Sequence, residues 1–315
     1  MFDQLLMLGV GFILLLVSTK VLVDLAEKMS ASFRISPLII GMTIVAIGTS
    51  FPELSVSTIA SIKQDGGLAM GNIVGSNIVN VFMGFSVGIL IGKLRIGTTK
   101  TQRSSLILLT VTALFIFLHF MPLGKFPQGL FLITLAVLVT IIEYKWAVFG
   151  RRHEDSKKLN SMKKEKFSLL EVIKLAVSIG AIVVGGFMVV VATQNISILT
   201  GYSTAVLGLS LTAVATSLPE LLTTVFSQEE NEEKITIGNI IGSNIYNLLL
   251  IGGIILYFSP NGSVPTIDWV ILSFSTILFV FIIKHYSGQK VPKWIGVLLL
   301  TFLFAYIYLQ TIPKS

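Results

Sequence analysis

The chain has 315 residues, of which 53% are hydrophobic and only 12% are charged, and its formal net charge is +7. Soluble domains carry roughly twice this proportion of charged residues. A mean hydropathy of +0.87 therefore excludes a soluble enzyme with a single membrane anchor, a disordered chain and a nucleic-acid-binding protein. The sequence predicts an all-α protein that crosses a lipid bilayer many times.

Ten apolar segments follow one another along the chain, each long enough to cross about 30 Å of hydrocarbon as a helix. They span residues 4–26, 35–61, 68–92, 104–121, 127–149, 169–194, 203–227, 235–258, 266–284 and 293–311. The chain begins Met-Phe-Asp-Gln, without the basic residues of a secretory signal, so the first segment is predicted to stay in the membrane. The absence of cysteine excludes thiolate metal sites and cysteine nucleophiles.

The basic residues predict the orientation of these segments. With ten spans, 20 of the 23 Lys and Arg residues lie nearest to span ends on one side, and only Lys63, Lys125 and Lys314 lie on the other. Lys and Arg accumulate on the cytoplasmic side of membrane proteins. Both termini are therefore predicted outside and the basic loop 150–168 in the cytoplasm.

Two blocks of the sequence are copies of each other. Residues 41–80 contain GMTIVAIGTSFPEL and GNIVGSNIVN, and residues 208–247 contain GLSLTAVATSLPEL and GNIIGSNIYN, with 15 identities in 40 positions at an offset of 167 residues. The chain thus divides into two five-helix repeats, residues 1–149 and 169–315. Because five is odd, equivalent helices must cross the membrane in opposite directions. Inverted repeats of this kind are typical of transporters, whose substrate site lies where the repeats meet.

Glu53 and Glu220 occupy matched positions deep within the second and seventh segments. A carboxylate at this depth costs roughly 3 kcal/mol or more, and no Lys or Arg lies at comparable depth to neutralise it. Pro52 and Pro219 precede the acids, lack an N–H group and so free carbonyl oxygens in the preceding turn. A bound cation is the expected partner of the two acids.

Hydroxyl and amide groups surround the acids in both repeats. They are Thr49, Ser50, Ser76 and Asn80 in the first, and Thr216, Ser217, Ser243 and Asn247 in the second. Oxygen donors without sulfur or imidazole suit hard cations, above all Ca²⁺. Glycines at positions 71, 75, 238 and 242 recur every four residues and are expected to allow close helix packing.

The paired motifs resemble the two α-repeats of the Ca²⁺/cation antiporter superfamily, and most closely those of prokaryotic sodium/calcium exchangers. The resemblance covers the whole chain and implies ten helices in inverted repeats. It places Glu53, Glu220 and the backbone oxygens of Thr49 and Thr216 on Ca²⁺. It also implies flanking Na⁺ sites at oxygens of Ala46, Ser50 and Ser76, and of Ala213, Ser217 and Ser243. Relatives often carry Asp where this chain has Asn80 or Asn247, which leaves the coupling ion and any role of K⁺ open.

These observations favour an antiporter, not an enzyme, that exchanges Ca²⁺ for Na⁺ in a prokaryotic plasma membrane and extrudes Ca²⁺. No resident cofactor and no nucleic-acid partner are expected. A Ca²⁺/H⁺ antiporter would use two protons to neutralise the same acids, and a passive cation channel would need an open path and no counter-ion. Both alternatives remain open from the residues alone.

Overall fold

The computed structural model describes residues 2–92, 94–97, 99–121, 124–149, 167–200, 212–258 and 262–311. The first half contains α1 (Phe2–Phe33), α2 (Pro37–Ile40), η1 (Gly41–Val45), α3 (Ala46–Thr49), α4 (Phe51–Ile62), α5 (Gly66–Val79), η2 (Asn80–Phe85), α6 (Ser86–Ile91), α7 (Thr99–Phe120) and α8 (Lys125–Phe149). The second half contains α10 (Leu169–Thr200), α12 (Ala213–Thr216), α13 (Leu218–Glu229), α14 (Glu233–Tyr246), η4 (Asn247–Ile251), α15 (Gly252–Phe258), α16 (Thr266–His285) and α17 (Lys293–Thr311). The η elements are π-helical turns.

The ten apolar segments predicted from the sequence fall mainly on these helices, although residues 203–211 of the seventh lie outside the described part of the chain. Seven helices in the described part of the chain are long and apolar enough to cross a membrane, when α5–η2–α6 and α14–η4–α15 are each counted as one continuous helix. An eighth candidate is the pair Pro37–Thr49 and Phe51–Ile62, which is bent by 44°. The fold is therefore that of an α-helical multi-pass membrane protein. Of the basic loop 150–168, only residues 167 and 168 are described.

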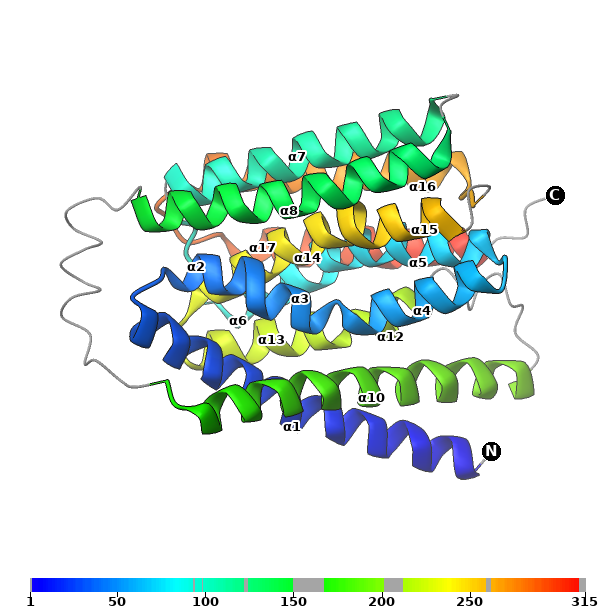
Figure 1. Ribbon diagram of the computed structural model, residues 1–315, viewed down its shortest axis with the longest axis horizontal. Coiled ribbons are helices and arrows are strands. Elements are labelled where there is room, and N and C mark those ends of the chain that lie inside the picture. Colours follow the sequence, from blue (N-terminus) through cyan, green and yellow to red (C-terminus); the bar gives the residue numbers. More distant parts are fainter. Residues whose placement is uncertain are drawn as a thin grey trace.

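The repeat in the sequence is reproduced in the backbone. Helices α3, α4 and α5 have the same bounds as α12, α13 and α14 when shifted by the 167 residues that separate Glu53 from Glu220, and the π-helical turns η2 and η4 both begin at the matched asparagine. In Figure 1, α3 and α4 run from left to right, whereas α12 and α13 run from right to left.

The two repeats interlock through their central helices. Helix α14 packs on α2, η1 and α3 of the first half, and α5 packs on α12 of the second. Helices α1 and α10 lie against each other along one edge of the molecule, and α7 and α8 lie along the opposite edge (Figure 1). The end of α8 and the start of α10 lie at the same end of the molecule, opposite the start of α1 (Figure 1).

Local sequence signals explain several helix boundaries. Pro37 opens α2, where its missing N–H costs no helical hydrogen bond. The side chain of Asp65 caps α5 by accepting a 3.0 Å hydrogen bond from the backbone N–H of Leu68. Gly92 ends α6 in the left-handed conformation, with φ of 85°.

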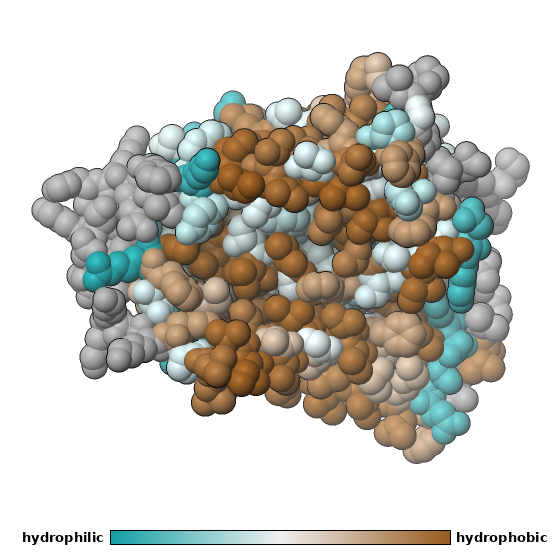
Figure 2. Space-filling model, viewed as in Figure 1, coloured by the Kyte–Doolittle hydropathy of each residue, from teal (hydrophilic) through white to brown (hydrophobic). Residues whose placement is uncertain are grey.

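Apolar side chains cover the outside of the molecule between its two ends. Figure 2 shows hydrophobic residues across the middle and hydrophilic residues gathered toward both ends. Trp294, Phe281 and Phe304 are more than half exposed, as expected of side chains that face lipid. The interior, in contrast, contains many buried Ser, Thr and Asn side chains, which gather around the two interlocked repeats.

Candidate functional site

Both candidate acids lie just after a break in a helix. Helix α3 ends at Thr49, Ser50 has φ of −80° and ψ of 4°, and α4 begins at Phe51. Ser217 repeats this geometry between α12 and α13, with φ of −81° and ψ of 5°. Each acid therefore stands in the first turn of a new helix. There the unpaired N–H groups and the helix dipole favour negative charge.

The two carboxylates are buried, and each is bound by a serine of the other repeat. Glu53 is 0% and Glu220 1% exposed. Ser217 Oγ donates to Glu53 Oε1 at 3.2 Å, and Ser50 Oγ donates to Glu220 Oε1, also at 3.2 Å. The structure thus brings these four predicted site residues together across the repeat interface.

The hydroxyl groups of Thr49 and Thr216 form hydrogen bonds across the same interface. Thr49 Oγ1 donates to Asn239 Oδ1, and Thr216 Oγ1 donates to Asn72 Oδ1, both at 3.2 Å. Thr216 Oγ1 also lies 3.3 Å from the Oγ of Ser76. Asn72 and Asn239 are not among the site residues predicted from the sequence. Their signal was present, because both stand directly after the first glycine of the repeated GNI motif.

The carbonyl oxygens of Ala46 and Ala213 lie beside these threonines. The oxygen of Ala46 accepts from the Ser50 N–H at 3.0 Å and from Thr49 Oγ1 at 3.3 Å. The oxygen of Ala213 accepts from the Ser217 N–H at 3.1 Å and from Thr216 Oγ1 at 3.2 Å. A carbonyl oxygen has two lone pairs. Each threonine hydroxyl has a single hydrogen, which it can direct either at this carbonyl oxygen or at the asparagine of the other repeat, so the carbonyl keeps a lone pair for a cation when the asparagine takes the hydrogen.

The matched asparagines begin the two π-helical turns. Asn80 Nδ2 donates to Ser243 Oγ at 3.2 Å and to Asn244 Oδ1 at 3.1 Å, both in the other repeat. Asn247 is fully buried, and neither of its amide atoms has a hydrogen-bond partner in the described part of the chain. Short π-helical turns frequently mark functional sites, because they redirect side chains within a helix.

Several buried oxygens around this network lack a hydrogen-bond donor among the described residues. They are Glu53 Oε2, Glu220 Oε2, Asn77 Oδ1, Asn80 Oδ1 and Asn247 Oδ1. A buried acceptor without a partner costs about 1–3 kcal/mol, and a charged one costs more. No group of three or more His, Cys, Asp or Glu side chains that could hold a metal occurs within the described ranges. A cation here would depend on two carboxylates supplemented by neutral oxygens, the donor set that Ca²⁺ accepts.

Two further acids are buried near helix ends. Asp268 is 0% and Glu143 2% exposed. Glu143 accepts from Ser104 Oγ at 2.9 Å and lies 3.7 Å from Arg103 Nη2. The Arg103 guanidinium also lies over the ring of Trp146, at 3.8 Å from its centroid. The basic partner distinguishes Glu143 from the two acids of the repeats.

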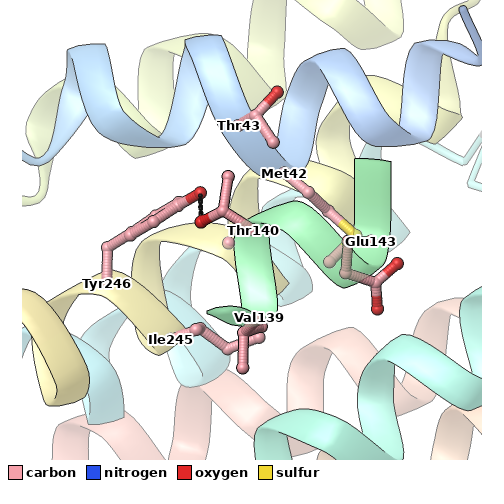
Figure 3. Close-up of a pocket in the computed structure, with 8 residues that line it drawn as sticks. Met42, Thr43, Val139, Thr140, Glu143, Ile245 and Tyr246 are labelled. Carbon is pink, nitrogen blue, oxygen red and sulfur yellow. Dashed lines mark hydrogen bonds between the residues drawn. The ribbon is translucent and has the colours of Figure 1, made fainter. Parts of the chain in front are cut away.

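A small pocket separates Glu143 from the repeats. It lies between η1, α8 and α14 and is lined by Met42, Thr43, Val139, Thr140, Glu143, Gly242, Ile245 and Tyr246 (Figure 3). The hydroxyl groups of Thr140 and Tyr246 lie 2.9 Å apart across it, and the carboxylate of Glu143 points away from them (Figure 3). Thr43 donates to the carbonyl oxygen of Ile39 at 2.7 Å, so the polar groups of the lining are engaged with one another or with the backbone and do not converge on a common point as an ion site would require.

Comparison with known proteins decides the family. The sequence pattern described as sodium/calcium exchanger protein matches residues 4–145 and 170–312. The chain belongs to this family. The chain is similar to Sodium/calcium exchanger MaX1 of Methanosarcina acetivorans, with 30% identity over 96% of this chain and 97% of that protein. Inner membrane protein YrbG of Escherichia coli is 31% identical over 93% and 92% of the two chains.

Solved structures of the sodium-calcium exchanger NCX_Mj share the family's fold with this chain. A structure soaked with Na⁺ and Sr²⁺ has a TM-score of 0.77 and 26% identity over 99% of both chains. One soaked without Na⁺ and Ca²⁺ has a TM-score of 0.78. MaX1 and NCX_Mj are named as exchangers, which agrees with the prediction that the chain is not an enzyme.

Proposed function

We propose that the chain is a secondary antiporter that exchanges Ca²⁺ for Na⁺ across the plasma membrane and extrudes Ca²⁺. The observation that carries this proposal is the buried pair Glu53 and Glu220, each with one carboxylate oxygen that has no partner in the described chain. One Ca²⁺ would neutralise both charges. Membership of the sodium/calcium exchanger family supports Na⁺ as the counter-ion.

In this proposal the bound cation replaces the hydroxyl hydrogens of Ser50 and Ser217 as the partner of the two carboxylates. Ser50 and Ser217 now direct their hydroxyl hydrogens at the acids. When a cation enters, each hydroxyl can rotate and present a lone pair instead. Glu53, Glu220 and the backbone oxygens of Thr49 and Thr216 would hold Ca²⁺. Flanking Na⁺ would use oxygens of Ala46, Ser50, Ser76, Ala213, Ser217 and Ser243, and the amides of Asn80 and Asn247 would complete the site.

Coupling follows from the energetics of the empty site. Without a cation, two carboxylates would repel each other in surroundings that exclude water, at a cost of several kcal/mol. This cost would prevent the unloaded protein from changing the side to which the site opens, so that one ion would leave only when the other enters. Alternating access would come from movement of one helix bundle against the other around a fixed site.

The proposed topology has ten spans in two inverted repeats, residues 1–149 and 169–315, with both termini outside and loop 150–168 in the cytoplasm. Opposite directions of the α3–α4 and α12–α13 segments support the inversion (Figure 1). The positive-inside rule supports the orientation. Cysteines introduced at Lys63 and at Glu230 test it, since only the first should react with a membrane-impermeant thiol reagent added outside intact cells.

Transport in proteoliposomes tests the function. Uptake of ⁴⁵Ca²⁺ is measured under an imposed Na⁺ gradient, a pH gradient, a K⁺ gradient or none. The proposal expects uptake driven by the Na⁺ gradient. Uptake driven by the pH gradient alone would favour the second candidate, a Ca²⁺/H⁺ antiporter in which two protons neutralise the same carboxylates. Uptake without any gradient of counter-ion would indicate a channel.

Variants of the acids locate the site. Glu53→Gln and Glu220→Gln should each abolish Ca²⁺ transport while the protein remains folded, because one charge of the pair that matches a divalent ion is lost. Glu143→Gln is the matched control, since Glu143 is equally buried but is paired with Arg103. If either repeat variant kept wild-type exchange, the site would not be built on two carboxylates.

A further inference from the structure

Each acid stands at the head of a row of polar side chains on its own helix. On α13 the row is Glu220, Thr224 and Gln228, which are at most 1% exposed. Residues four apart lie on the same face of an α-helix, one above the other. Eight residues of helix rise about 12 Å. The row therefore leads from the candidate site to the end of α13, where Glu229 is exposed.

Part of the hydrogen-bonding capacity of this row is unused. Thr224 Oγ1 and Gln228 Oε1 are buried and have no partner in the described part of the chain. Gln228 Nε2 donates to Thr236 Oγ1 at 3.0 Å, which holds the amide against α14. A purely structural network would be expected to satisfy its members, because each unpaired buried oxygen costs about 1–3 kcal/mol. Unpaired oxygens in line with Glu220 are instead suited to a passing cation.

The row faces glycines of the third predicted span. A methyl group on Gly88 would lie 3.3 Å from Thr224 Cγ2 and 3.4 Å from Thr236 Cγ2. One on Gly84 would lie 4.0 Å from Thr224 Oγ1. No side chain of η2 or α6 thus occupies the space opposite Thr224 at these two positions. Thr224 packs directly against these glycines, so there is no open path between the two helices in this structure. On the glycine side, only hydrogen atoms form the contact.

The end of the row meets a cluster of acids. Glu229, Glu230, Glu232 and Glu233 follow Gln228 within five residues, and Glu229 and Glu230 are exposed. Glu230 forms an ion pair with Lys20 of α1. Negative charge at the mouth of a polar path raises the local concentration of cations. Because of its position at the end of the row, the acid cluster would attract cations to the row.

The first repeat carries the counterpart of this row. Glu53, Ser57 and Ser61 are spaced in the same way on α4, and all three are 0% exposed. Ser57 Oγ accepts from Asn72 Nδ2 at 2.9 Å, and Ser61 Oγ has no partner in the described chain. Because α4 and α13 run in opposite directions (Figure 1), the two rows lead from the acids to opposite ends of the molecule.

We propose that these rows are the two routes of the transported cation. Glu220, Thr224 and Gln228 form the route to the end of the molecule that carries loop 150–168, and Glu53, Ser57 and Ser61 form the route to the other end. Each route passes a cation from carboxylate to hydroxyl to a polar group at the helix end, in steps of about 6 Å. The proposal rests on the function proposed above and adds the path by which the site is reached.

Single cysteines test the routes directly, because the chain contains no native cysteine. Thr224→Cys and Ser57→Cys are made separately, and the reagent is a charged, membrane-impermeant methanethiosulfonate. Leu222→Cys and Ser55→Cys are the matched controls, at equivalent positions just beyond each acid and off the rows. Labelling is followed in proteoliposomes from either side, in Na⁺ and in Ca²⁺.

The proposal expects Thr224→Cys to react at least 10-fold faster than Leu222→Cys, and only from the side that exposes loop 150–168. Ser57→Cys should exceed Ser55→Cys by a similar factor, and only from the other side. If the row positions reacted no faster than their controls in any ionic condition, or if both reacted from the same side, the routes would be wrong. Labelling does not require transport, so this result is separate from any failure of the proposed exchange.

Substitutions at the narrow contact provide a second test. Thr224→Val keeps the shape of the side chain and removes the hydroxyl, whereas Thr224→Ser keeps the hydroxyl and removes the methyl group that faces Gly88. We expect Ca²⁺ flux to fall at least fivefold in Thr224→Val and to stay near wild type in Thr224→Ser. Gly88→Ala should slow the flux, and adding Thr224→Ser should restore it. Equal flux in Thr224→Val and Thr224→Ser would overturn the role of the hydroxyl.

Discussion

Gly242 lies where helix α14 crosses the π-helical turn η1, and replacing it with alanine should loosen that crossing. A methyl group at this position would lie 2.3 Å from the carbonyl oxygen of Met42 and 2.7 Å from Ala46 Cβ. Non-bonded carbon contacts are ordinarily about 3.5 Å or longer, so the two elements would have to separate by roughly 1 Å. This is backbone against backbone, and no side chain can rotate out of the way.

The cost can be worked from the contacts. Overpacking of a well-packed interior costs about 1–3 kcal/mol. The same movement would stretch the 3.2 Å hydrogen bond from Thr49 to Asn239 beyond bonding distance, at a further cost of about 1 kcal/mol. Alanine regains about 1 kcal/mol because it favours the helix more than glycine does. The expected net loss is therefore about 1–3 kcal/mol.

Thermal melting of the purified protein in detergent measures this loss. Gly180→Ala is the matched control, because a methyl group on Gly180 of α10 has nothing within 4 Å. We expect Gly180→Ala to melt at or above the wild-type temperature and Gly242→Ala to melt several degrees below it. A Gly242→Ala protein as stable as Gly180→Ala would show that α14 and η1 do not depend on this close approach.

Three further changes test other contacts. Lys20 holds the pKa of the Glu230 carboxyl below its usual value by hydrogen bonding and charge, so their pair stabilises the protein above pH 4.5 and is lost as pH falls through the lowered pKa. Lys20→Met should therefore lower the melting temperature more at pH 7 than at acidic pH, where Glu230 becomes protonated, and an equal effect at both would contradict the assignment. Arg103→Met should destabilise the protein by about 1–3 kcal/mol, which is less than the cost of breaking a fully buried ion pair because the arginine is 36% exposed. Glu143→Gln should be tolerated, and chemical denaturation measures the stability of both variants. Asn247→Asp adds a third acid to the site, so it should change the ratio of Na⁺-driven to H⁺-driven ⁴⁵Ca²⁺ uptake, and an unchanged ratio would place Asn247 outside the ion site.

Much of the fold follows from the sequence because lipid leaves few choices. Backbone groups in hydrocarbon must bond within their own segment, so apolar runs of this length become helices. The copied motifs predicted the matched positions of Glu53 and Glu220. The four-residue spacing of glycines predicted close helix packing, which the structure confirms at Gly238 and Gly242. These features depend on local pattern and on the internal repeat.

Other features of the site depend on which helices pack against each other, and local sequence patterns do not indicate this packing. The sequence predicted hydroxyl oxygens of Ser50 and Ser217 around the acids, but it did not predict that each serine binds the acid of the other repeat. The exchange is set by packing between segments far apart in the chain. Asn72 could not be predicted as a site residue for the same reason, because its partner Thr216 is in the other repeat. The burial of Glu143 likewise follows from neighbours on α7.

The π-helical turn η2 has a consequence for chain length. It inserts one extra residue per turn between α5 and α6, at Asn80–Phe85. Each residue of an α-helix turns the following segment by about 100°. Deleting one residue between positions 81 and 83 would let this turn relax to α-helix and would leave the following segment facing nearly the same way, because the π-helical turn already takes up one extra residue. Deleting one within the regular helix α6 would instead turn every later residue of the span by about 100°. The turn is therefore the place where this span can lose a residue while its two halves keep the same neighbours.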